Sequence, residues 1–307
     1  DVTASARLTA DGAPRWPDDD TAEALRLVTT VFTALAEWRR DRARAADSVI
    51  PGRADALDIH LDTAEFFETP GRKTGLGSSA ALTVALAGAL AAWYGEPSPT
   101  LTGLVAAHRA LQGGRGSGAD IGAALTGGII VYRGADTVTP TAQPTRLPPG
   151  LHYVCVFTGR SASTADALAR LADWRQSEPK AYRQALARLA ETAEAGAAAL
   201  MAADPDALLA AVAEYGMRLD ALGGAAGIDI VSDDHRRLRN AATGCGVIYK
   251  SSGAGGGDIG IGISRDADHI EAFRRAATGL GYRIIDLSTA SQGLDVCVTG
   301  SEQGTER

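Results

Sequence analysis

The chain has 307 residues and a net charge of −7 at neutral pH. That length allows two domains, and the acidic balance argues against nucleic acid or an acidic membrane surface as the main partner. The longest apolar run, Ala80 to Tyr94, is shorter than the roughly 20 residues that a membrane span requires. The three cysteines, Cys155, Cys245 and Cys297, form no CxxC pair, so they indicate neither a disulfide framework nor a zinc site and suit a reducing cytoplasm.

Two patterns precede the first glycine-rich segment of the chain. Apolar residues recur at spacings of three and four from Leu25 to Leu35, which predicts a helix with one apolar face. Apolar and polar residues alternate from Leu57 to Leu61, which predicts a half-buried strand with His60 on its polar side.

A small-residue loop, Lys73 to Ala81, leads directly into an apolar, helix-forming run that ends at Tyr94. Glycines let the backbone turn tightly and approach a ligand closely. The first turn of a helix offers unpaired N–H groups and the positive end of the helix dipole, so the loop favours an anion, above all a phosphate. Helix capping is the alternative role for the two hydroxyls of this loop, those of Ser78 and Ser79.

A second glycine-rich loop, Gly113 to Asp120, follows a helix that we predict over Leu101 to Leu111. A strand is expected next, from Ile129 to Tyr132. The proline-containing stretch from Asp136 to Pro149 has little hydrophobicity and marks a domain boundary. The sequence therefore predicts an N-terminal domain of residues 1–145 and a C-terminal domain of residues 146–307.

The C-terminal half contains a third glycine-rich loop, Ser251 to Asp258, placed between two predicted strands. A strand over Tyr153 to Phe157 opens this half. The remaining pattern predicts helices over 165–175, 180–201, 205–222, 233–242 and 267–280, and strands over 247–249, 259–263, 282–287 and 294–298, the last of which closes the sheet.

Four segments in order carry a more specific resemblance. KTGLGSSAA, from Lys73, is similar to the ATP-phosphate loop of the GHMP kinase superfamily, which includes galactose, homoserine, mevalonate and phosphomevalonate kinases. AHRALQGGRGSGADIGAALTGGIIVYR, from Ala107, resembles the phosphomevalonate kinase pattern of a histidine, a Gln-Gly and a Gly-Ser-Gly-x-Asp. FTGRSAST resembles the Trp-Thr-Gly turn of that family, with Phe157 in place of tryptophan. YKSSGAGGGD resembles its Lys-Pro-Ser-Gly-Ala-Gly-Gly-Gly-Asp motif, with Ser251 in place of proline.

The resemblance implies an α+β fold of two domains, the first similar to domain 2 of ribosomal protein S5 and the second ferredoxin-like. It implies an ATP- and Mg²⁺-dependent phosphotransferase that converts 5-phosphomevalonate to 5-diphosphomevalonate in the mevalonate pathway of isoprenoid biosynthesis. One family motif, Pro-x-Lys-x-x-x-x-Gly-Glu, does not occur between Asp1 and Trp16, and we expect it upstream of Asp1.

On the ATP side, the resemblance implies that the first loop binds the phosphates and that the hydroxyl of Ser79 is a ligand of Mg²⁺. The backbone N–H groups that form the phosphate site belong to Gly75, Leu76, Gly77, Ser78, Ser79 and Ala80.

On the acceptor side, the resemblance implies that Asp120 and Lys73 are the catalytic residues and that Lys73 also contacts the substrate. Asp120 faces the accepting oxygen, either as a base or by orienting the nucleophile. A phosphate acceptor is already ionised near neutral pH, which favours the orienting role. A helix N-cap is the alternative role for Asp120.

Further substrate contacts implied by the resemblance come from the second and third loops: Gln112, Ser117, Gly118, Lys250, Ser252, Gly253, Ala254 and Gly255. Arg115 lies at a variable position of the family pattern and is a weaker candidate. His108 shares a helix face with Gln112. Because no second ligand stands at metal-binding spacing, we interpret His108 as a packing or pocket-wall residue, not a zinc ligand.

Two alternatives remain open at this point. The first is mevalonate kinase or another small-alcohol kinase of the superfamily; mevalonate kinase carries a metal-binding glutamate shortly before its aspartate, and the segment from Leu101 to Gly118 contains no acidic residue. The second is a nucleotide-binding relative without transfer activity, which the missing N-terminal lysine motif supports. The expected partner is a small anionic substrate, with neither nucleic acid nor membrane, and the expected state is a cytoplasmic monomer or homodimer.

Overall fold

A computed structural model of the chain describes residues 3–9, 12–45, 57–69, 72–73, 76–114, 116–134, 139–160, 164–253 and 255–299, with the backbone alone for 67–69, 72–73 and 164–166. The chain divides into two compact units. Unit 1 comprises Asp1–Ala64, Gly77–Pro144 and Thr289–Arg307, and unit 2 comprises Glu65–Leu76 and Thr145–Ser288.

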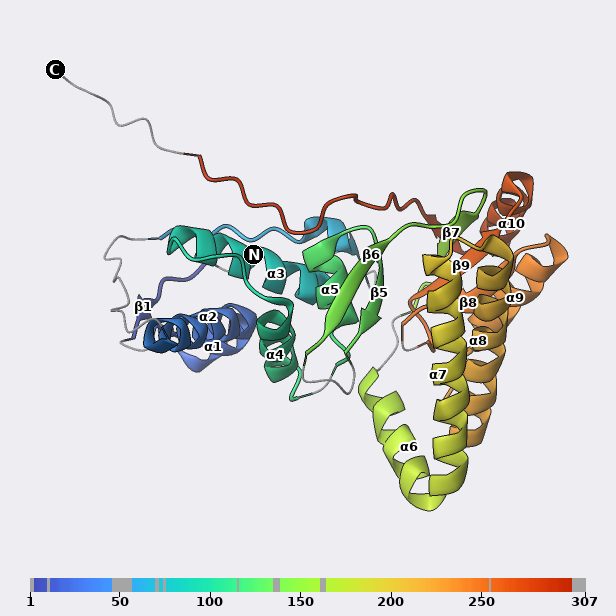
Figure 1. Cartoon of the computed structure of the whole chain (residues 1–307), viewed down its shortest axis with the longest axis horizontal. Helices are drawn as coiled ribbons and strands as arrows, with labels where there is room; N and C mark the ends of the chain where they lie inside the picture. The colour runs from blue at the N-terminus through green and yellow to red at the C-terminus, as the bar shows by residue number, and fades with distance from the viewer. Residues whose placement is uncertain are drawn as a thin grey trace. The chain divides into compact units, whose positions relative to one another are not determined.

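The described part of unit 1 is mainly helical (Figure 1). Its helices are α1 (Asp19–Ala24), α2 (Arg26–Ala45), α3 (Ser78–Trp93), α4 (Leu101–Leu111) and α5 (Ala119–Thr126). Its strands pair in twos, β1 (Arg7–Leu8) with β2 (Pro14–Arg15) and β5 (Ile129–Arg133) with β6 (Thr141–Thr145). The helices predicted around the first two glycine-rich loops are confirmed.

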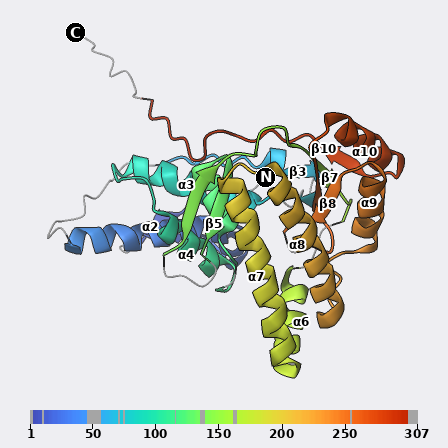
Figure 2. The ribbon, with the colours of Figure 1, turned by 45° about the vertical axis from the view of Figure 1, so that its right-hand side comes forward.

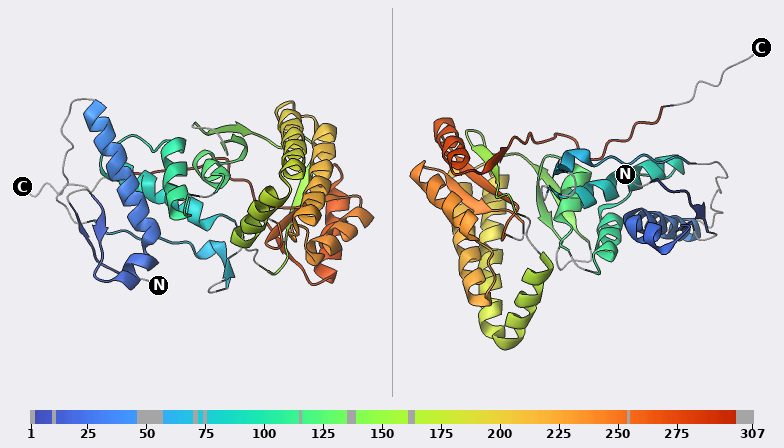
Figure 3. Two further views of the ribbon diagram at one scale, coloured as in Figure 1. Left: turned by 90° about the horizontal axis from the view of Figure 1, so that it is seen from below. Right: turned by 180° about the vertical axis from the view of Figure 1, so that it is seen from behind.

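Helix α3 is the central helix of unit 1 because its sequence is apolar around the whole circumference, as is typical of a buried helix. It packs against α2, α4 and α5 (Figures 1 and 3). A segment near the C-terminus of the chain covers another side of α3, where the side chains of Leu294 and Val296 lie against Gly88.

Two strand predictions for unit 1 are wrong. Residues 57–61 are irregular, and the side chains of Leu57 and Leu61 pack against the helical core. The segment 294–298 is also irregular and does not close a sheet; Leu294 and Val296 lie against α3 instead, and Val298 is exposed. In both segments some apolar side chains pack on the helical core, but Ile59 and Val298 are exposed and the backbone is not a strand.

Unit 2 is built on a four-stranded antiparallel sheet with the strand order β10-β7-β9-β8. The strands are β7 (His152–Phe157), β8 (Ile248–Ser251), β9 (Ile259–Ser264) and β10 (Arg283–Ile285). Along the chain they follow the sequence strand, helices, strand, strand, helix, strand, which is the βαββαβ arrangement of a ferredoxin-like fold. The predicted α+β class is therefore confirmed.

Five long helices accompany this sheet, and Figure 2 shows α7 and α8 side by side. They are α6 (Thr164–Ser177), α7 (Pro179–Met201), α8 (Pro205–Ala226), α9 (Asp233–Gly244) and α10 (Ala267–Gly279). Helices α9 and α10 bury one face of the sheet around Val154, Val156 and Tyr249. A short 3-10 turn (Ala64–Phe66) precedes the hairpin of β3 (Phe67–Thr69) and β4 (Arg72–Lys73).

In the ranges that the structure describes, no helix combines the length and the apolar character needed to cross a bilayer.

Candidate functional site

The first glycine-rich loop ends at the N-terminus of α3, where Gly77 is the N-cap residue in a left-handed conformation with φ 77°. Glycine adopts this conformation without the steric cost of a side chain. Ser78 and Ser79 occupy the first two helical positions, so neither serine is the cap and the capping alternative is wrong. Because Gly77 supplies no capping side chain, the first N–H groups of α3 suit an anionic ligand.

The rest of the first loop is described only in part. Lys73 is the last residue of β4, so the loop begins one residue later than predicted. The structure describes the backbone of Lys73 but not its side chain, and Gly75 lies outside the described residues. Leu76 is exposed, and Ala80 is buried in the first turn of α3.

The second glycine-rich loop ends in the same way, with Gly118 as the N-cap of α5 at φ 85°. The N-cap role considered for Asp120 is therefore wrong, because Asp120 lies inside the first turn of α5. Its Oδ1 accepts a hydrogen bond from the backbone N–H of Ile121 at 3.0 Å. Its side chain is 41% exposed, so the carboxylate remains accessible to a ligand.

The N-termini of α3 and α5 lie next to each other in unit 1. A Cβ atom on Gly77 would come within 3.7 Å of the Cβ atom of Asp120. The two helices pack against each other, so the positive ends of two helix dipoles meet at one point. The structure thus brings together Gly77 of the first loop and Asp120, which lie 43 residues apart in the sequence.

His108 connects the two helix N-termini through its imidazole ring. Nε2 lies 2.8 Å from the Oγ of Ser79, and Nδ1 lies 3.9 Å from Oδ2 of Asp120. The ring is only 3% exposed. Burial lowers the pKa of His108 below its ordinary value although the Asp120 carboxylate opposes the shift, so the ring is neutral at physiological pH. From the sequence, His108 is interpreted as a packing or pocket-wall residue, and its contact with Ser79 is not predicted.

Two side chains outside the glycine motif hold the second loop. The guanidinium of Arg109 donates hydrogen bonds to the carbonyl oxygens of Gly116, Ser117 and Gly134, at 3.0, 3.1 and 3.1 Å. The hydroxyl of Tyr132 donates to the carbonyl of Ser117 at 2.8 Å. Both residues were missed from the sequence, because only the fold brings them to the loop.

The predicted substrate residues of the second loop differ in exposure. Gln112 and Ser117 are exposed, whereas Gly118 is buried. A side chain on Gly118 would collide with Tyr132 and Val105, so this position requires glycine. Arg115 lies outside the described residues.

In unit 2, Lys250 is a half-buried cation on strand β8. Its Nζ donates a hydrogen bond to the carbonyl of Ser251 at 2.6 Å and lies 5.7 Å from the ring centroid of Tyr215. Burial lowers the pKa of Lys250, and none of the described carboxylates forms an ion pair with it. An ammonium group that has lost water without gaining a counter-charge is suited to an anionic ligand.

The third glycine-rich loop follows Lys250 and is fixed by backbone hydrogen bonds. The N–H of Ser252 donates to the carbonyl of Ile259 at 2.8 Å, and the N–H of Gly256 donates to the carbonyl of Ile230 at 2.7 Å. Gly253 is exposed and Gly255 is buried, both with positive φ, and Ala254 lies outside the described residues.

The end of the third loop is held by a turn and by a buried histidine. The N–H of Asp258 donates to the carbonyl of Arg160 at 2.6 Å, so Asp258 fixes the loop through its backbone. His235 is 0% exposed, and its two ring nitrogens lie 2.9 Å from the carbonyl of Gly257 and 2.9 Å from the hydroxyl of Tyr249. A carbonyl only accepts hydrogen bonds, so Nε2 donates to Gly257 and the Tyr249 hydroxyl donates to Nδ1. Burial lowers the pKa of His235, which keeps this ring neutral. Nothing in the sequence indicates this contact.

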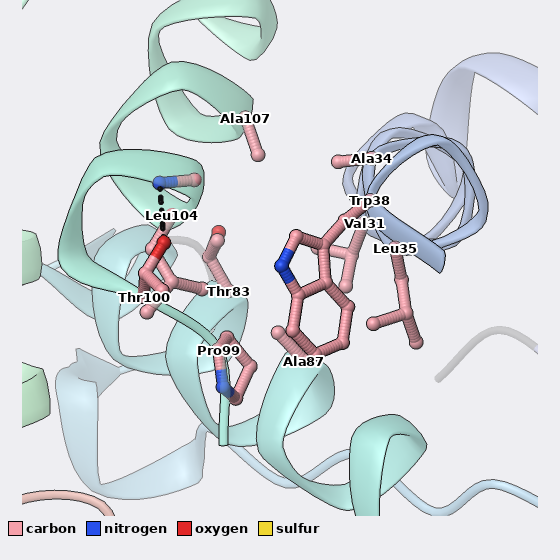
Figure 4. Close-up of a pocket in the computed structure, with 11 residues that line it drawn as sticks. Val31, Ala34, Leu35, Trp38, Thr83, Ala87, Pro99, Thr100, Leu104 and Ala107 are labelled. Carbon is pink, nitrogen blue, oxygen red and sulfur yellow. Dashed lines mark hydrogen bonds between the residues drawn. The ribbon is translucent and has the colours of Figure 1, made fainter. Parts of the chain in front are cut away.

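A separate pocket in unit 1 lies between α2, α3 and α4 (Figure 4). Side chains such as Trp38, Ala87 and Leu104 line it, and none of the lining residues is charged. Such a lining does not suit a phosphorylated ligand, so we assign this pocket to the packing of the helical core.

The site combines two glycine-rich loops that lead into helix N-termini, the Ser79 hydroxyl in the first turn of α3 and the accessible Asp120 carboxylate in the first turn of α5. These are the parts of a phosphotransferase. Residues 43–128 match the family described as GHMP kinases N terminal domain. Over 265 residues the chain is 30% identical to phosphomevalonate kinase from Streptomyces sp. (strain CL190), covering 77% of this chain and 70% of that protein. The chain belongs to the GHMP kinase family.

Solved structures share the same fold. A Lin0012 protein from Listeria innocua is 23% identical with a TM-score of 0.76, covering 90% of this chain and 80% of that chain. Streptococcus pneumoniae phosphomevalonate kinase, in complex with phosphomevalonate and AMPPNP, is 19% identical with a TM-score of 0.65, covering 86% and 80%.

Proposed function

We propose that the chain transfers the γ-phosphoryl group of ATP to 5-phosphomevalonate and forms 5-diphosphomevalonate and ADP. The observation that carries this proposal is the 30% identity to a phosphomevalonate kinase over 70% of that protein. The half-buried Lys250 supports an acceptor that is itself phosphorylated. The lack of any acidic residue between Leu101 and Gly118 supports the same acceptor over a simple alcohol.

On the nucleotide side, the N–H groups at the start of α3 bind ATP phosphate oxygens, together with the loop from Gly75 to Ala80. The Ser79 hydroxyl fits Mg²⁺, which prefers oxygen ligands. Among the described residues, no group of three or more His, Cys, Asp or Glu side chains is placed to hold a metal ion. Mg²⁺ commonly takes only one or two protein oxygens beside phosphates and water, and when bound it neutralises phosphate charge.

On the acceptor side, an oxygen of the substrate phosphate attacks the γ-phosphorus, and the bond from that phosphorus to the β-phosphate oxygen of ATP breaks. The second pKa of a phosphomonoester is about 6, so this nucleophile is already ionised at neutral pH. Asp120 therefore orients the acceptor rather than deprotonating it. Lys250 and Lys73 balance the negative charge of the two phosphate groups.

The remaining contacts with the acceptor are assigned to exposed or loop positions: Gln112, Ser117, Gly118, Ser252, Gly253, Ala254 and Gly255. The product of this reaction is a soluble diphosphate, and we place the enzyme in the cytoplasm with its nucleotide supply.

A coupled assay of ADP release tests the proposal with three acceptors, 5-phosphomevalonate, mevalonate and homoserine. We expect turnover with 5-phosphomevalonate and little with the other two. Turnover with mevalonate alone would replace the proposal with an alcohol kinase. Binding of AMP-PNP without turnover of any acceptor would identify a nucleotide-binding relative that does not transfer phosphate.

A further inference from the structure

The imidazole of His108 lies between the hydroxyl of the first loop and the carboxylate of the second. Its Nε2 is 2.8 Å from the Oγ of Ser79 and 3.4 Å from the side-chain nitrogen of Gln112. Its Nδ1 is 3.9 Å from Oδ2 of Asp120. The ring belongs to α4 and is buried. Because Ser79 lies in the first turn of α3 and Asp120 in the first turn of α5, the two ring nitrogens face different helix N-termini of unit 1.

These neighbours determine which nitrogen carries the proton. The amide nitrogen of Gln112 is a donor only, so Nε2 faces a donor and acts as the acceptor. The carboxylate of Asp120 is an acceptor only and favours a proton on Nδ1. With the proton on Nδ1, the short contact between Nε2 and Ser79 is a hydrogen bond that the hydroxyl donates.

A serine hydroxyl has one proton to donate and two lone pairs to offer. Once its proton is directed to His108, Ser79 cannot donate to a phosphate oxygen, but its lone pairs stay available to a cation. Ser79 lies in the first turn of α3, two residues after the left-handed Gly77, so this oxygen is held at the phosphate-binding end of the helix.

We propose that His108 is a positioning residue that orients the Ser79 hydroxyl, by accepting its proton at Nε2, so that the oxygen faces the cation of a metal–nucleotide complex. This inference rests on the proposed function for its ligand, an Mg²⁺-bound nucleoside triphosphate. It assigns His108 a role that reaches the ligand only through Ser79.

The test measures the affinity for AMP-PNP by titration calorimetry, once with excess Mg²⁺ and once with EDTA. The readout is the dissociation constant measured with EDTA divided by the one measured with excess Mg²⁺, so a larger ratio means a stronger dependence on Mg²⁺. This measurement needs neither an acceptor nor turnover. We expect His108→Phe to reduce this ratio by about tenfold, the size expected for losing one oriented hydrogen bond. Ser79→Ala is expected to reduce it similarly, and the double variant no further, because both changes remove the same interaction.

Two variants separate orientation from packing. His108→Gln places an amide oxygen near the position of Nε2, so it is expected to restore most of the Mg²⁺ dependence that His108→Phe removes. Leu104→Ala removes a buried apolar side chain from the same helix and is expected to lower the melting temperature while leaving the ratio unchanged. If His108→Phe does not fold, His108→Met replaces it with the same expectation.

A wild-type ratio retained in His108→Phe would overturn the inference, as would independent, multiplicative effects in the double variant. A wild-type protein whose AMP-PNP affinity does not depend on Mg²⁺ would overturn it as well. The proposed acceptor is tested separately, because a protein that fails to phosphorylate 5-phosphomevalonate still reports on His108 through nucleotide binding.

Discussion

Replacing Asp120 with alanine should abolish most turnover and leave the fold nearly intact. The carboxylate lies in the first turn of α5 beside Gly77, and its side chain is 41% exposed. A group that orients or activates a nucleophile typically contributes about 10²–10⁴ to the rate. We therefore expect kcat of Asp120→Ala to fall by at least about a hundredfold.

The cost in stability is small because Asp120 makes few structural contacts. It accepts one hydrogen bond, from the N–H of Ile121 at 3.0 Å, and its charge interacts with the N-terminal dipole of α5. Together these contribute about 1 kcal/mol at a partly exposed site. For units of 150–250 residues this corresponds to a melting temperature lower by about 2–4 °C.

ADP release with saturating 5-phosphomevalonate measures kcat, and calorimetry with AMP-PNP measures nucleotide binding. The matched variant Asp120→Asn keeps the shape of the side chain and is expected to retain more activity than Asp120→Ala. Its kcat/KM should still fall below about pH 6, where the acceptor phosphate takes up a proton. Near-normal kcat in Asp120→Ala would remove Asp120 from the mechanism, and loss of that acid limb in Asp120→Asn would show that Asp120 is the base.

Three other changes have expected outcomes. Lys250→Met should raise KM for the phosphorylated acceptor by about 10–100-fold, which is the contribution of a hydrogen bond to a charged group. The affinity for AMP-PNP should stay constant. An unchanged KM would count against an anion site at Lys250. Gly255→Ala should lower the free energy of unfolding by about 1–3 kcal/mol, as measured by thermal or denaturant melts. The new methyl group would collide with the carbonyl of Ile230, and Gly255 has a positive φ that alanine adopts only with strain. Equal stability would show that the loop moves freely. His235→Gln should weaken the loss of stability on acidification. Burial lowers the pKa of His235 in the folded state, so its contribution to stability is fully present above about pH 6.5 and is lost as the pH falls from there through the lowered pKa of the folded state. Melting curves measured from neutral to acidic pH check it, with the exposed His152→Gln as the control.

The helices were predictable because their apolar spacing is long and regular. The observed bounds of α4, Leu101–Leu111, match the predicted ones. The strand predicted over Tyr153 to Phe157 is found as β7, His152–Phe157. The five-residue alternation from Leu57 to Leu61 misled, since a short irregular segment can place two leucines on a core equally well. The strand prediction for 294–298 was wrong for a related reason. Gly88 has no side chain, so the side chain of Leu294 packs against α3 at this position.

The candidate site was predictable where glycine and small hydroxyl residues mark it in the sequence. The residues that hold the loops were not, because their contacts are tertiary. Arg109 reads from the sequence as a basic residue in the last turn of a helix, yet its guanidinium turns to three loop carbonyls. His235 reads as one polar residue in a charged helix, yet it is fully buried against Gly257.

The second and third loops share one physical arrangement, in which side chains from outside the glycine motif fix the loop backbone. Ordering a free backbone costs about 1–2 kcal/mol per residue, and a glycine-rich loop bears this cost in full. Arg109 and Tyr132 at Ser117, and His235 at Gly257, order these loops before any ligand arrives. A site ordered in advance loses less free energy on binding and directs its dipoles at the transferring phosphate from the start. Substitution of these three side chains should therefore weaken transfer even though none of them needs to touch ATP or the acceptor.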